Sequence, residues 1–207
     1  MSLADTLATF QASASQCDAL IANAHQADAT GLAVLPSLDQ RQITVAAFLN
    51  LFVSWETFLE ESLIKLLIDH PTISGRLPIR YVSPPTIDAA RRLVVGVQRF
   101  FDYGNHDNVR KMVSIYFENG YPFEPHLSAI NTDLSDLRTM RNASAHITST
   151  TQTALEGLAQ RLFSTPQPGI DLYTLLTKPD PRSVLGNTVF AGSREKLMTV
   201  AGLIANG

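Results

Sequence analysis

The chain has 207 residues, of which 45% are hydrophobic and 17% are charged, and its formal net charge at pH 7 is −3. This length can bury a sizeable core, the composition excludes a disordered polyelectrolyte, and the single cysteine, Cys17, excludes disulfide frameworks and thiolate metal sites. The slight negative charge disfavours a broad, sequence-independent nucleic-acid surface, although a few arginines can still form a local phosphate site.

Helical patterns cover most of the chain and predict an all-α fold in a single domain, residues 1–207. The longest uninterrupted pattern has no glycine or proline and ends before Pro71. Between residues 164 and 191 the prolines and the lack of a clean period predict an irregular segment with one short helix. The predicted helices are at about residues 3–28, 39–70, 86–101, 106–118, 124–145, 150–163 and 193–205.

Strand and membrane signals are weak. The only strand candidate is "PIRYVS", which is bracketed by Pro78 and Pro84. The most apolar run, "ITVAAFLNLFVSW", is too short to cross a bilayer, and the first residues lack the pattern of a secretory signal. We therefore expect a cytoplasmic soluble protein with no membrane partner.

Two charged residues fall on apolar helix faces. On an ideal helical wheel Glu56 lies near the centre of the apolar face of residues 39–70, and Arg141 lies among apolar residues of 124–145. A separate polar ridge, spaced by four residues, consists of Arg138, Asn142 and His146. Arg141 and His146 project roughly 140° apart on a straight helix, so a long side chain, an altered last turn or a second protomer is needed to bring them together.

These positions also have a purely structural interpretation. Arg141 and Glu56 would then form an ion pair that ties two helices together. His146 would be an exposed histidine that complements the dipole at the end of its helix. The wheel geometry leaves this alternative open.

The spacing of "RNASAH", residues 141–146, resembles the Arg-Asn-x-x-x-His motif of the HEPN superfamily, which comprises all-α domains that include many RNases. The upstream "SWETFLEESL" resembles the second long helix of HEPN proteins of the RiboL-PSP type. The resemblance covers about residues 40–165 and leaves 166–207 as a C-terminal extension. It implies an up-down helical bundle of HEPN type with extra C-terminal helices.

The resemblance implies a metal-independent endoribonuclease without a cofactor. His146 would be the acid and base, Arg141 would clamp the phosphate, and Asn142 would orient the imidazole or hold a phosphate oxygen. Glu56 would hold Arg141 in place, and Arg138 would support the site from the polar ridge. The 2′-hydroxyl would attack the phosphorus and leave a 2′,3′-cyclic phosphate.

The implied partners are RNA, a second copy of the chain, whose motif would complete the cleft, and a cognate antitoxin protein, since the activity suits a toxin or defence component. Two alternatives stay open at this point. One is a catalytically inactive HEPN domain that binds RNA or nucleotides, and the other is a helical dimeric interaction domain without a nucleic-acid role.

Overall fold

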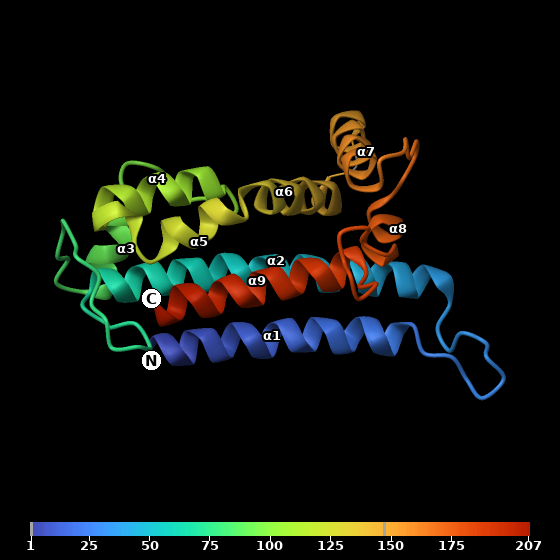
Figure 1. Ribbon diagram of the computed structural model, residues 1–207, viewed down its shortest axis with the longest axis horizontal. Helices are drawn as coiled ribbons and strands as arrows, with labels where there is room; N and C mark the ends of the chain where they lie inside the picture. The colour runs from blue at the N-terminus through green and yellow to red at the C-terminus, as the bar shows by residue number, and fades with distance from the viewer. Residues whose placement is uncertain (1, 147) are drawn as a thin grey trace. The chain divides into compact units, whose positions relative to one another are not determined.

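The computed structural model describes residues 2–146 and 148–207 (Figure 1). Within these residues the chain is all-α, as predicted, with one short 3₁₀ helix and no strand. The helices, in chain order, are α1 (Leu3–Ala24), α2 (Ser37–Leu67), α3 (Ile87–Val95), α4 (His106–Tyr116), η1 (Glu118–Gly120), α5 (Phe123–Ala129), α6 (Asn131–Ala145), α7 (Ser149–Phe163), α8 (Leu172–Thr177) and α9 (Val189–Asn206).

The chain divides into two compact units, and each unit takes residues from distant parts of the sequence. Unit 1 comprises residues 2–11, 54–134 and 197–207, and unit 2 comprises residues 12–53 and 135–196. Helices α1, α2, α6 and α9 contribute residues to both units. The single domain and its C-terminal extension stay predictions.

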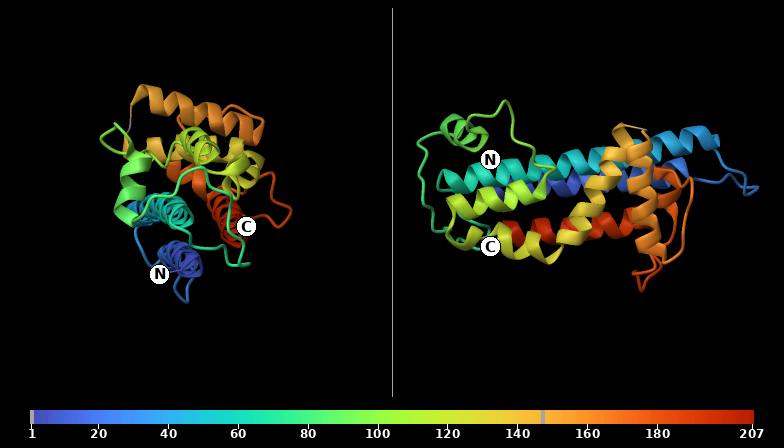
Figure 2. Two further views of the ribbon diagram at one scale, coloured as in Figure 1. Left: turned by 90° about the vertical axis from the view of Figure 1, so that its left-hand side faces the viewer. Right: turned by 90° about the horizontal axis from the view of Figure 1, so that it is seen from above.

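In unit 1 the start of α1 packs antiparallel to the second half of α2, and both views show these helices running side by side (Figures 1 and 2). The Lys65 ammonium contacts the Thr6 hydroxyl, and the ring of Phe10 lies 5.9 Å from that of Trp55. These side chains are excluded from water: Phe10 and Trp55 are at most 2% exposed. Aromatic burial therefore forms the centre of this unit.

Helices α3, α4 and α5 complete unit 1. The hydroxyl of Tyr116 on α4 donates to the backbone oxygen of Leu93 on α3 at 2.9 Å. Arg110 on α4 forms a two-pronged ion pair with Glu124 on α5, with a shortest distance of 2.6 Å. Such forked pairs fix orientation as well as adding energy, so α4 and α5 are held in one geometry.

In unit 2 the end of α1 is joined by side-chain contacts to the start of α2 and to α9. His25 Nε2 lies 3.1 Å from the Thr44 hydroxyl, and Arg194 on α9 lies 3.6 Å from Asp18 on α1. Helices α7 and α8 add buried leucines, including Leu158. The irregular segment predicted over 164–191 is confirmed for residues 164–188, which contain only the short helix α8 within the described chain, but its last three residues already belong to α9.

Several predicted helices differ from the structure by two to four residues at an end; for example, α1 ends at Ala24 rather than at residue 28, and α9 begins at Val189 rather than at residue 193. Two predictions are wrong by more. The helix predicted over 86–101 ends at Val95, because Gly96 adopts a left-handed φ of 59° that side chains with a Cβ rarely accept. The helix predicted over 124–145 is two helices that break at Ile130. Asn131, at the break, starts a polar stretch whose side chains favour caps over helix interiors, which explains the interruption.

The strand candidate does not form a strand. Arg80 makes only an isolated bridge to Phe117. Among the described residues one helix, α2, is long and apolar enough to cross a membrane by length and composition, with an 18-residue window of mean hydropathy 1.3. The run "ITVAAFLNLFVSW", predicted to be too short to cross a bilayer, lies within this helix. Of that window 44% is buried inside the protein, and core helices pass the same test, so this is weak evidence for a membrane.

Candidate functional site

Helix α6 carries the "RNASAH" motif at its C-terminal end. Leu137 and Met140 are each 2% exposed and anchor the helix in the core of unit 2. Arg141 and Asn142 are half-buried, and His146 is exposed directly after the last helical residue. The helical wheel suggested that Arg141 is enclosed in the core, but Arg141 lies at the border of the core.

The backbone of the motif is fixed by hydroxyl groups. The Ser144 hydroxyl donates to the backbone oxygen of Arg141 at 2.6 Å, and the Thr151 hydroxyl donates to that of His146 at 2.6 Å. Thr151 also forms a reciprocal capping box with Thr148 at the start of α7. The turn after α6 is thus tied to α7 although the imidazole of His146 faces solvent.

The side chains of the motif make few contacts within unit 2. Arg141 Nη1 donates to the Asn142 amide oxygen at 3.5 Å, the outer limit of a hydrogen bond. Among the described residues of unit 2 no carboxylate forms an ion pair with Arg141. Within this unit, therefore, the guanidinium is not neutralised and its donors are available to an anion.

The other two predicted site residues are placed differently. Arg138 lies on α6 in unit 2, and of the three residues of the predicted polar ridge it and His146 are exposed, whereas Asn142 is half-buried. Glu56 lies on α2 in unit 1 and is half-buried. Its predicted contact with Arg141 would join two units that are described separately, and it stays a prediction.

A pocket that the sequence analysis missed adjoins the motif in unit 2. Its volume is about 500 Å³, and Ala143 and Ser144 form part of its wall. Its rim carries Arg41, which pairs with Asp171 at 2.5 Å and lies over the ring of Tyr173. The remaining wall is mainly aliphatic, so this pocket is suited to apolar groups, whereas the motif side chains are suited to an anion.

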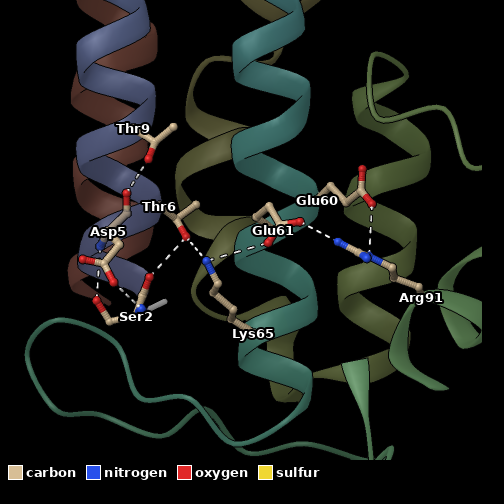
Figure 3. Close-up of polar contacts among 8 residues, drawn as sticks. All are labelled: Ser2, Asp5, Thr6, Thr9, Glu60, Glu61, Lys65 and Arg91. Carbon is tan, nitrogen blue, oxygen red and sulfur yellow. Dashed lines mark hydrogen bonds and ion pairs between the residues drawn. The ribbon is translucent and has the colours of Figure 1, made fainter. Parts of the chain in front are cut away.

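A network of charged residues joins α2 to α3 in unit 1 (Figure 3). Arg91 on α3 lies between two α2 carboxylates, 2.8 Å from Glu61 and 3.7 Å from Glu60. Glu61 also lies 3.7 Å from the ammonium of Lys65, which is buried. Burial raises the pKa of Glu60, and the nearby charge of Arg91 only partly opposes this effect.

The raised pKa of Glu60 predicts a pH-dependent effect of Glu60→Gln on stability. A carboxyl whose folded pKa is raised stabilises the protein below its unfolded pKa and loses this contribution as pH rises through the folded pKa. We expect Glu60→Gln to raise the melting temperature relative to wild type, and to raise it more at pH 7 than near pH 4. Thermal unfolding followed by circular dichroism at several pH values measures this difference.

Glu61→Gln is the matched control, one residue away. It removes the closer partner of Arg91 and the counterion of buried Lys65, so it is expected to lower the melting temperature at pH 7. Equal shifts of the same sign in the two variants would contradict the assignment of the desolvated carboxyl to Glu60.

Comparisons with protein-family models, with curated proteins and with solved structures give no match to this chain. Within residues 2–146 and 148–207, no group of three or more His, Cys, Asp or Glu side chains is arranged to hold a metal ion.

Proposed function

We propose that this chain is a metal-independent endoribonuclease of HEPN type that acts as a homodimer, in the role of a toxin or defence component. One observation carries the proposal: at the end of α6, an exposed histidine follows a half-buried arginine that no carboxylate of its unit neutralises in the described residues. A guanidinium next to an accessible imidazole is suited to the cleavage of a phosphodiester.

The chemistry follows from these two side chains. The 2′-hydroxyl of RNA attacks the adjacent phosphorus as His146 takes its proton, and the 5′-oxygen leaves with a proton, which gives a 2′,3′-cyclic phosphate and a 5′-hydroxyl. Arg141 binds the non-bridging oxygens, whose negative charge increases in the transition state. Asn142, which lies 3.5 Å from Arg141, orients the imidazole or holds a phosphate oxygen.

A single imidazole cannot readily take the proton of the 2′-hydroxyl and also deliver a proton to the leaving oxygen on the opposite side of the phosphorus. In a homodimer the second copy of His146 delivers the proton to the leaving oxygen. The exposed positions of Arg138 and His146 support this arrangement, because both side chains reach the surface where a second copy can approach.

The test is RNA cleavage by the purified protein in EDTA. We expect fragments that end in a 2′,3′-cyclic phosphate, identified by mass spectrometry and by resistance to phosphatase until the ring is opened by acid. If the protein cleaves no RNA of a broad panel, the proposal fails, and RNA binding without cleavage would then identify an inactive binding domain. Fragments with a 3′-hydroxyl would also overturn it.

A further inference from the structure

Unit 1 contains a second pocket, which shares no residue with the motif. Its volume is about 240 Å³, below the roughly 300–1,000 Å³ typical of drug-sized ligands and suited to one ring system. It forms because α3 ends at Gly96 and the following loop turns back towards α3 and α2. Its walls hold one carboxylate, two guanidinium groups and three aromatic rings: Glu60, Arg91, Arg99, Phe100, Phe101 and Tyr103.

Three of these side chains, Glu60, Arg99 and Phe100, can still contact a ligand. The Glu60 oxygen nearest to Arg91 is 3.7 Å from Nε, beyond hydrogen-bond distance, and neither Glu60 oxygen accepts a hydrogen bond from the described residues. Within the same residues Arg99 forms no ion pair. Phe100 is 68% exposed, although it belongs to the pocket wall. The Glu60 side chain is 38% exposed and its carboxylate can still accept hydrogen bonds, so a ligand that supplies donors would be stabilised here.

The composition of the wall narrows the class of ligand. A cation would suit Glu60 and the aromatic rings but would be repelled by the two arginines. A simple anion would suit the arginines but would be repelled by Glu60. A flat ring that donates hydrogen bonds at one edge and carries an anionic group elsewhere satisfies all three kinds of side chain.

We propose that this pocket binds the guanine base of a nucleotide. Guanine presents two adjacent donors, N1–H and N2–H, which the two oxygens of the Glu60 carboxylate can accept together. The base stacks on Phe100, and Arg99 binds the phosphate. The other common bases present no such adjacent pair of donors on one edge. This inference does not depend on the proposed ribonuclease activity, because binding at this pocket uses none of the motif residues.

Isothermal titration calorimetry of the full-length protein with GMP, IMP and AMP tests the proposal. IMP lacks only the N2 amino group and is expected to bind about tenfold more weakly than GMP, and AMP more weakly still. Guanosine without phosphate should bind more weakly than GMP, and Arg99→Ala should abolish this difference. The proposal would be overturned if IMP or AMP bound as tightly as GMP, or if GMP did not bind at millimolar concentration.

Variants at the wall assign the binding to this pocket. Phe100→Ala removes the stacking surface, and Glu60→Gln replaces one acceptor by a donor, so each is expected to weaken GMP binding about tenfold. Val97→Ala is the matched control, because Val97 lies on the same loop, is fully exposed and is not part of the wall. If Val97→Ala weakens GMP binding as much as Phe100→Ala, the assignment to this pocket is wrong. The assignment is also wrong if tetramethylammonium, a simple cation, displaces GMP. RNA cleavage measured on the same variants separates a failure here from a failure of the proposed function.

Discussion

Replacing His146 with alanine is expected to reduce the rate of RNA cleavage by about 10²–10⁴-fold, the usual contribution of a positioned general acid or base. The fold should be unaffected, because His146 is exposed and its hydrogen bonds run through its backbone to Asn142 and Thr151. Surface substitutions of this kind change the free energy of unfolding by about 0.5 kcal/mol or less. The measurement is the cleavage rate of labelled RNA in EDTA, together with the melting temperature of each variant.

Two further variants make this result specific. His70→Ala removes a histidine outside the motif and should keep the wild-type rate. Arg141→Lys keeps the positive charge but loses the planar fork of donors, so it should lower the rate without changing the charge of the site. Cleavage that persists at the wild-type rate in His146→Ala would show that the nuclease activity comes from another site or from a contaminant.

Much of the fold could be predicted because its signals are local. Ala- and Leu-rich segments without glycine or proline predicted the long helices, and Pro71 predicted the end of the second one at residue 70, three residues after its observed end at Leu67. The errors lie where local signals were weak: Gly96 ends α3 through its left-handed backbone, and Ile130 breaks a continuous apolar period. The interleaving of the two units could not be predicted, because contacts between segments far apart in the sequence leave no periodicity.

The motif could be located from the sequence, but its surroundings could not. The spacing of Arg141 and His146 is visible in one segment, whereas the hydroxyl of Thr151 that holds the turn comes from the next helix. The wheel placed Arg141 deeper than it lies, because the last turn of α6 extends to the border of the core. The guanine pocket was missed entirely, since Glu60 and Phe100 come together only after the chain has turned at Gly96.

Replacing Trp55 with alanine is expected to lower the free energy of unfolding by about 3–5 kcal/mol, the usual cost of truncating a fully buried large aromatic side chain. Trp55 is fully buried and its ring stacks 5.7 Å from Phe58 on the same helix and lies 5.9 Å from Phe10 on α1, so both α1 and α2 lose contacts in unit 1. Urea denaturation followed by circular dichroism measures the change. Val184→Ala, at a fully exposed position, is the control and should have almost no effect.

Trp55→Phe separates packing from hydrogen bonding. Phenylalanine keeps much of the aromatic contact but removes the indole N–H, which donates to Nε2 of buried His106 at 2.9 Å. Loss of a donor to a buried acceptor costs about 1–3 kcal/mol, so Trp55→Phe should fall between wild type and Trp55→Ala and remain folded. An effect below about 1 kcal/mol in both variants would show that Trp55 does not pack in the core of unit 1. The pairing of α1 with α2 described for that unit would then be wrong.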